Sequence, residues 1–109
     1  MATSAVIDRV LAALNAGDLE AFVACYAADA TIEDGDDTVL ARGQAQIRAR
    51  YAPMLERSPM LNVELLDRWE LDPYVVQEER VTGRSPDPER HIAVYRIMDG
   101  RIARERLLR

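Results

Sequence analysis

The first quarter of the chain carries apolar residues at the spacing of two amphipathic helices. We expect the first helix to start after Ser4 as N-cap and to stop at Gly17. Asp18 follows at once and can cap a second helix, where its carboxylate suits the positive helix end. So short a junction makes the two helices meet at an angle over a common core. Their apolar stripes are Val6, Ile7, Val10, Leu11 and Leu14, then Leu19, Phe22, Val23 and Tyr26.

A hairpin and a third helix are expected next. Residues 30–41 alternate like two short strands around an Asp-Gly-Asp-Asp turn. Gly43 then begins a helix that carries Tyr51 on its apolar face. Pro53 should kink or end that helix, because proline has no backbone N–H and its ring clashes with the preceding turn.

From Met60 onward the hydrophobic period changes from helical to strand-like. The four expected strands are 61–70, 73–82, 90–98 and 101–108. The pair Asp-Gly between the last two is a strong hairpin signal. Three helices followed by these strands predict an α+β fold, with a four-stranded antiparallel meander and a small hairpin.

Two of the expected strands lack a purely apolar face. The mixed faces are Val75, Gln77, Glu79 and Val81 in one strand and His91, Ala93, Tyr95 and Ile97 in the other. Polar groups therefore stand where an ordinary core would place aliphatic side chains. This pattern favours a wet or ligand-filled pocket over a packed core.

The composition is that of an ordinary globular protein, with 49% apolar and 30% charged residues. A chain of 109 residues fits one domain, 1–109. No window approaches the run of about 18 apolar residues that a membrane span needs. The N-terminal stretch has no basic region ahead of an apolar one, so it does not resemble a signal peptide. We therefore expect a cytoplasmic protein without a membrane partner.

Single residue types exclude several chemistries. Cys25 is the only cysteine, so no intrachain disulfide can form, and its apolar surroundings favour a buried side chain over a nucleophile. All 14 basic residues are arginine, which excludes a lysine Schiff base and a phosphate-loop lysine. With one histidine, and with acids that lack the spacing of a calcium loop, no metal site and no cofactor are expected.

The charge is unevenly distributed along the chain. The net charge is -5, and residues 1–38 hold eight acids against one arginine. The arginines of the second half are interleaved with acids and apolar residues. Nucleic-acid binding requires a concentrated basic face, so nucleic acid is not expected as a partner.

Four stretches together resemble the nuclear transport factor 2-like superfamily. They are Tyr26–Asp34 (YAADATIED), Gly43 at a helix start, residues 81–83 (VTG) and residues 99–102 (DGRI). The order of the expected elements is also similar over nearly the whole chain. Within the superfamily, the sequence most resembles the SnoaL-like polyketide cyclases and the ketosteroid isomerases.

The resemblance implies a particular architecture and a kind of partner. Three N-terminal helices would pack in a strongly curved, mixed but mainly antiparallel sheet, the cone-shaped cystatin-like roll, around a mostly apolar cavity. A small hydrophobic molecule would bind in that cavity. Homodimers would form through the outer sheet face. The activities of the family include isomerisation and cyclisation without a cofactor.

The resemblance also implies a catalytic centre at Asp34, which matches the carboxylate that removes a proton next to a carbonyl in isomerase-like members. Burial can tune the pKa of such a base. The positions of the family's two oxyanion donors are Val10 and Ala93 here, and neither can donate a hydrogen bond. Loss of one donor costs about two powers of ten in rate, so steroid isomerisation by the usual pair is not expected.

Other residues could supply the missing donors. By the same alignment Tyr95 and His91 are candidate catalytic residues beside Asp34, because a phenol can donate to an oxyanion and an imidazole can exchange protons near neutral pH. The candidate ligand-binding residues are Gln77, Glu79, Glu105, Tyr51 and Phe22.

Less specific interpretations remain open for the same residues. Asp34 is also typical of a turn carboxylate before glycine. His91 could lie at a sheet edge, and Glu79 could pair with charges at a dimer surface. Trp69 and Tyr74 are expected in rim or core packing. The chain could therefore be a small-molecule isomerase or cyclase, a ligand-binding protein without catalysis, or a dimerisation module.

Overall fold

A computed structural model describes residues 3–109, so the first two residues of the N-terminal stretch considered above lie outside it. Three helices and six strands alternate in the order that the sequence predicts. They are α1 (Ala5–Ala16), α2 (Leu19–Val23), β1 (Tyr26–Asp34), β2 (Val39–Arg42), α3 (Gly43–Arg57), β3 (Asn62–Leu71), β4 (Tyr74–Thr82), β5 (Glu89–Met98) and β6 (Arg101–Leu108).

The strands form one six-stranded mixed sheet in the order β2-β1-β6-β5-β4-β3. Each neighbouring pair is antiparallel except β1 and β6, which run parallel. The expected hairpin β1–β2 is therefore not separate from the meander β3–β6, because the parallel pair joins them. The α+β fold and the mainly antiparallel sheet are confirmed.

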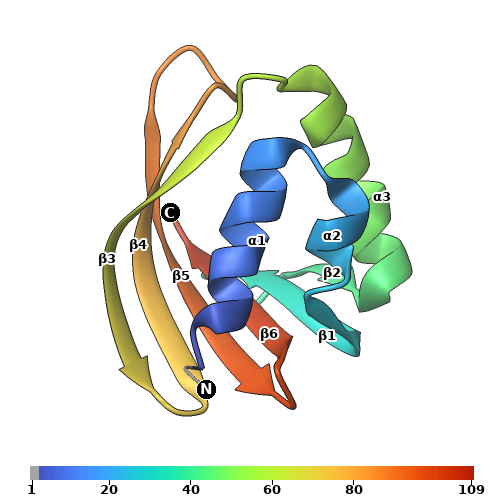
Figure 1. The fold of residues 1–109 in the computed structure, drawn as a ribbon, viewed down its shortest axis with the longest axis vertical. Helices are drawn as coiled ribbons and strands as arrows, with labels where there is room; N and C mark the ends of the chain where they lie inside the picture. Colours follow the sequence, from blue (N-terminus) through green and yellow to red (C-terminus); the bar gives the residue numbers. More distant parts are fainter. Residues whose placement is uncertain (1–2) are drawn as a thin grey trace.

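The sheet is curved, and the three helices lie on its concave side (Figure 1). Strands β3, β4 and β5 stand beside α1, while β6, β1 and β2 bend beneath the helices (Figure 1). The register shifts within β1, β3 and β5, at Ile32/Glu33, Leu65/Asp67 and Arg96/Ile97. Such bulges bend a strand and increase its twist, which allows the sheet to wrap around the helices.

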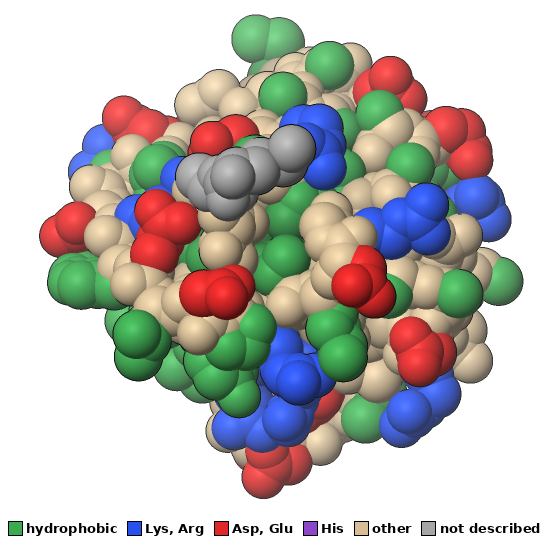
Figure 2. Space-filling model, turned by 60° about the horizontal axis from the view of Figure 1, so that its bottom comes forward, with side chains coloured by type: hydrophobic (Ala, Val, Ile, Leu, Met, Phe, Trp, Pro, Cys, Tyr) green, Lys and Arg blue, Asp and Glu red, His purple; other side chains and the backbone are tan. Residues whose placement is uncertain are grey.

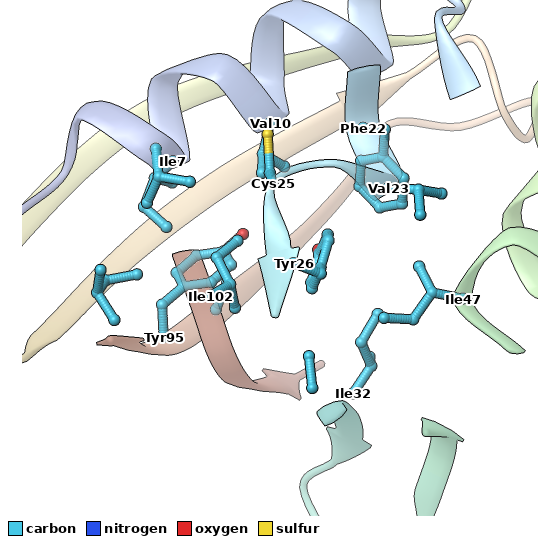
Figure 3. Close-up of a cluster of buried hydrophobic side chains, with 14 of the residues drawn as sticks. Ile7, Val10, Phe22, Val23, Cys25, Tyr26, Ile32, Ile47, Tyr95 and Ile102 are labelled. Atoms are coloured by element: carbon cyan, nitrogen blue, oxygen red, sulfur yellow. The ribbon is translucent and has the colours of Figure 1, made fainter. Parts of the chain in front are cut away.

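The main hydrophobic core lies between the inner sheet face and the helices. Figure 3 shows its side chains gathered under α1, with Phe22 from α2 and Tyr95 from β5 among them. Ile7, Ile32 and Ile47 are fully buried there. A second, smaller cluster of Leu11, Leu61, Val63 and Val81 fills the space between α1 and the strands β3 and β4.

The boundaries of α1 and α2 follow the predicted signals. Gly17 ends α1 with a φ of 69°, the left-handed conformation that favours glycine. Asp18 caps α2, since its carboxylate accepts a hydrogen bond of 3.1 Å from the Ala21 N–H. Helix α2 ends at Val23, so Tyr26 belongs to β1 and not to the helical stripe, and Cys25 is buried in the turn between them.

Pro53 was expected to kink or end the third helix, and it does not end it, because α3 continues to Arg57. Pro53 lies on the exposed side of the helix. There the carbonyl that loses its N–H partner can bond to water instead, which makes an internal proline tolerable.

Two aromatic side chains lie on the outer surface. Trp69 and Tyr74 were expected in rim or core packing, and at 57% and 47% exposed neither packs into the core. On the face turned forward in Figure 2, acidic and basic side chains are interspersed with hydrophobic ones, and no large area of one charge sign forms there. Among residues 3–109, no helix is long and apolar enough to cross a membrane.

Candidate functional site

A cavity of about 320 Å³ lies between the three helices and the inner face of β3–β6. Its wall is mixed: aliphatic and aromatic side chains come from both helices and strands, and acid, imidazole and guanidinium groups make up the rest. The resemblance implied a mostly apolar cavity, and this one also carries seven ionisable acid, imidazole and guanidinium side chains. The lining residues are Val10, Leu14, Phe22, Tyr26, Arg50, Tyr51, Met54, Arg57, Leu61, Val63, Glu79, Val81, Arg84, His91, Tyr95, Glu105, Leu107 and Arg109.

Glu79 is the centre of a hydrogen-bond network on the sheet side of the cavity. Its side chain comes from the middle of β4 and is only 3% exposed. Oε1 lies 2.8 Å from Nε2 of His91, and Oε2 accepts from Tyr95 Oη at 3.2 Å and Gln77 Nε2 at 2.6 Å. Because β4 and β5 pair with Glu79 opposite His91, the register itself brings the carboxylate and the imidazole together.

Gln77 supports this network from behind and does not line the cavity. It is fully buried, and its Oε1 accepts a 2.9 Å hydrogen bond from Nε of Arg68. Arg68 also binds Asp8 of α1 at 2.8 Å, which ties the network to the helix layer. The amide oxygen of Gln77 binds Arg68 and its amide nitrogen binds Glu79, so Gln77 orients Glu79 from outside the cavity wall.

A second buried acid, Glu105, faces the cavity from β6. Tyr26 donates its hydroxyl proton to Oε1 in a very short hydrogen bond. Burial raises the pKa of Glu105 to about 8, the charge of Glu79 adds to the rise, and the Tyr26 hydrogen bond opposes it. Glu105 lines the cavity, and its Oε2 has no hydrogen-bond partner among the described residues. The raised pKa favours the protonated acid at neutral pH.

The aromatic wall comes from the helices. Phe22 packs against Tyr51 with ring centroids 4.6 Å apart and against Tyr26 at 5.1 Å. Burial raises the pKa values of Tyr26, Tyr51 and Tyr95, so all three phenols keep their protons. The hydroxyl of Tyr51 makes no hydrogen bond to another described residue and is not sealed, so it borders the cavity.

Asp34 lies at the end of β1, beside the cavity and not in its wall. Oδ1 accepts from the N–H groups of Asp36 and Thr38, at 3.0 and 3.2 Å, in the turn to β2. These are the contacts of a turn carboxylate. Asp34 borders a neighbouring hollow that shares Arg50, Leu107 and Arg109 with the cavity. Its role as catalytic base stays a prediction.

The sequence identified part of the polar wall. Strand alternation placed His91 and Tyr95 on one face of their strand and Glu79 on one face of the neighbouring strand, and the alignment with the family turned these faces inward. The structure brings all three residues to the cavity. Two features were missed. Tyr26 was assigned to a helical stripe, so its hydrogen bond with Glu105 was not predicted. The two residues are 79 apart in sequence, and the parallel pairing of β1 with β6 brings them together. The arginines at the cavity were treated as surface charge.

The two positions that resemble the family's oxyanion donors are apolar in the structure as well. Val10 lines the cavity, and Ala93 is fully buried in β5. Neither can donate a hydrogen bond, whereas Glu105, which lines the same cavity, can donate one when it is protonated. Residues 3–109 contain no group of three or more His, Cys, Asp or Glu side chains arranged to hold a metal ion.

Comparison with known proteins defines the class. Residues 7–105 match the family model of the SnoaL-like domain, and the chain belongs to this family. An uncharacterised cystatin-fold protein from Novosphingobium aromaticivorans is similar over 100% of this chain and 99% of its own, with a TM-score of 0.89 and 26% identity.

Two further solved structures share the fold. A candidate polyketide cyclase from Sinorhizobium meliloti has 23% identity and a TM-score of 0.81, over 94% of this chain and 92% of its own. A ketosteroid isomerase-like protein from Catenulispora acidiphila, solved with trimethylamine, has 18% identity and a TM-score of 0.78, over 97% and 85%. At these identities the likeness extends to the fold and not to the chemistry.

Proposed function

We propose that this protein binds a small carbonyl compound in the cavity and moves a proton on it, as an isomerase or cyclase. The observation that carries the proposal is the buried acid Glu105, which lines the cavity while Tyr26 donates a hydrogen bond to its Oε1. A neutral carboxylic acid in an apolar site is a strong hydrogen-bond donor to a developing oxyanion. Glu105 would replace the two oxyanion hydrogen-bond donors that are absent at Val10 and Ala93.

The proposed base is the Glu79–His91 pair. A proton leaves the carbon next to the carbonyl for the imidazole, where the carboxylate at 2.8 Å stabilises the charge. The electron pair moves onto the carbonyl oxygen, which accepts the hydrogen bond from Glu105. In a β,γ-unsaturated substrate, the imidazolium returns the proton to the γ-carbon of the dienolate and gives the conjugated isomer. In a substrate with a second carbonyl, the enolate carbon attacks that carbonyl carbon and closes the ring, and the imidazolium returns its proton to the new alkoxide. Tyr95 donates to Glu79 and so serves this base by positioning it.

Asp34 is the other candidate for the base. It lies on the same side of β1 as the buried Ile32, and the hollow it borders adjoins the cavity through Arg50. A change in the Asp34–Thr38 turn would have to release its carboxylate from two backbone N–H groups before it could reach a ligand.

Hydrogen–deuterium exchange at the carbon next to a ketone tests the proposal without knowledge of the natural product. We expect the protein to speed exchange of 2-tetralone in D2O, followed by NMR. Glu105→Gln should reduce the acceleration by about 10²-fold, the usual cost of one oxyanion donor. His91→Asn should abolish it if the pair is the base, and Asp34→Asn should do so if Asp34 is.

A matched control is Glu56→Gln, which removes an exposed glutamate on α3 and should leave exchange unchanged. No acceleration over buffer, or full acceleration in folded Glu105→Gln, would contradict the proposed chemistry. Binding of the ketone with no exchange would favour a ligand-binding protein without catalysis. The lack of hydrogen-bond donors at Val10 and Ala93 supports that alternative.

Homodimer formation through the outer sheet face is a separate proposal. That face exposes Tyr74, Ile92 and Leu108, which are 47%, 39% and 38% exposed. Arginines from β5 and β6 surround them, as at the polar rim of an interface. Light scattering should give a dimer, and Ile92→Arg should give a monomer; a monomeric wild-type protein would rule the dimer out.

A further inference from the structure

Four arginines line the same cavity, and the proposed proton transfer uses none of them. Arg50 and Arg57 lie two turns apart on α3, Arg84 lies in the loop between β4 and β5, and Arg109 follows β6. Three separate parts of the chain thus bring guanidinium groups to one opening. We refer to these four residues as the arginine rim.

The arginine rim is short of carboxylate partners. Arg84 forms an ion pair with Glu89, with N–O distances of 2.9 and 2.8 Å. Among residues 3–109, Arg50, Arg57 and Arg109 form no salt bridge. Six other arginines pair with acids: Arg48, Arg68, Arg80, Arg90, Arg104 and Arg106. The arginine rim therefore carries positive charge that no carboxylate of the described residues neutralises.

Three of the four arginines act on the hydroxyl of Tyr51, which lines the same cavity. Burial and the charge of Glu105 raise the pKa of Tyr51, and the positive charges of Arg50, Arg109 and Arg84 lower it. That hydroxyl borders the cavity and is not hydrogen-bonded to any described residue. A phenol donor and three cations around one open space form a favourable setting for an anion.

The interior of the cavity has the opposite character. The buried acids Glu79 and Glu105 lie there, and both are unsuited to hold an anion. The same cavity wall also carries apolar side chains, among them Leu14, Met54 and Leu61. A fitting ligand has an anionic group at the rim, an apolar body, and an uncharged oxygen at the acids.

We propose that the ligand is an apolar carboxylic acid: its carboxylate binds the arginine rim, and its carbonyl oxygen reaches Glu105. This inference rests on the proposed function, because it takes the reacting oxygen to be held by Glu105. Arginine matches a carboxylate with two parallel N–H bonds, and the chain uses arginine for every basic position. The net charge of -5 would repel anions elsewhere, so the positive rim directs an acid to this opening.

Two naphthalene probes separate the two halves of the site. 2-Naphthol presents a hydroxyl in place of an enolate oxygen and has no carboxylate. 6-Hydroxy-2-naphthoic acid adds a carboxylate at the far end of the same rings. We expect the acid to bind at least about tenfold more tightly than naphthol at low salt, equivalent to about 1.4 kcal/mol. Added salt should reduce that advantage, since it screens charges at an open rim.

Rim variants identify the residues responsible. Arg50→Gln and Arg84→Gln should each weaken the acid several-fold and leave 2-naphthol unchanged. Arg42→Gln is the matched control, because Arg42 is exposed on β2 away from the cavity and should affect neither probe. Circular dichroism and melting temperature confirm that each variant is folded.

The outcomes distinguish this inference from the proposed function. Equal affinity for the two probes, or an acid advantage that survives both rim substitutions, would overturn the carboxylate assignment. If Glu105→Gln leaves naphthol binding unchanged while the rim variants weaken the acid, the proposed role of Glu105 fails and the rim stands as an anion site. If neither probe binds, both proposals fail.

Discussion

Two buried acids in one cavity have different surroundings, and this difference defines the site at the residue scale. Glu79 accepts hydrogen bonds from Gln77 and Tyr95, and its other oxygen lies 2.8 Å from Nε2 of His91. Glu105 accepts one, from Tyr26, and burial raises its pKa to about 8. A buried acid with a single donor suits a proton.

The raised pKa of Glu105 predicts how stability depends on pH. The folded protein holds the proton up to about pH 8, whereas the unfolded chain releases it near 4.5. Between these values the folded state binds more protons, so the free energy of unfolding falls as the pH rises, by at most about 1.4 kcal/mol per pH unit. Glu105→Gln should remove this fall, and its stability relative to wild type should improve with increasing pH.

Urea unfolding at pH 5, 6, 7 and 8 measures the effect, with Glu56→Gln as a control that should keep the wild-type slope. Identical slopes in wild type and Glu105→Gln would show that Glu105 ionises at an ordinary pKa.

At the scale of elements, the junction between α3 and β3 positions one wall of the cavity. After α3 the chain crosses from Ser58 to Leu61 and passes close to Gly83 at the end of β4. Gly83 has a φ of 81°, and a Cβ there would lie 2.0 Å from the carbonyl oxygen of Met60. The close approach of two backbones fixes where Leu61 and Arg84 meet the cavity.

Gly83→Ala should therefore destabilise the protein more than Gly17→Ala. Both glycines have a positive φ, which costs an alanine about 1–2 kcal/mol, but a Cβ at Gly17 would meet open space. The additional cost at Gly83 comes from displacement of backbone, and we expect it to exceed about 2 kcal/mol in chemical denaturation. Equal losses in the two variants would mean that the chain near Met60 moves freely.

At the scale of the whole molecule, the curved sheet leaves a space that the helices do not fill. The parallel pair β1–β6 joins the hairpin to the meander, and the sheet bends under the helices (Figure 1). Side chains from both layers line the cavity. A volume of about 320 Å³ lies at the lower end of the usual range for ligand pockets. Open space of this size forgoes packing contacts, which is expected where binding matters more than stability.

A larger side chain inside the cavity should abolish ligand binding and leave the protein folded. Val10 lines the cavity from α1, and Val10→Phe would place a ring inside it. We expect a melting temperature close to that of the wild type and loss of 2-naphthol binding in a fluorescence titration. Val94→Phe makes the same exchange on the outer sheet face and should keep binding. Undiminished binding to folded Val10→Phe would place the ligand elsewhere.

The sequence alone predicted what depends on local patterns. Helix limits at Gly17 and Asp18, the strands of the meander and the mixed faces of β4 and β5 follow from spacing, and the structure confirms them. These features are local because backbone conformation and strand alternation are fixed by near neighbours. The SnoaL-like resemblance followed from short motifs in the same way, and the family match confirms it.

Only the tertiary structure decided which side chains meet. Tyr26 and Glu105 are brought together by a parallel strand pair, and the arginine rim is assembled from α3, a loop and the segment after β6. Asp34 shows the reverse case, since its motif suggested a site but its carboxylate is bound by its own turn. Long-range pairing and burial cannot be read from local spacing, and these two quantities determine the chemistry of a cavity.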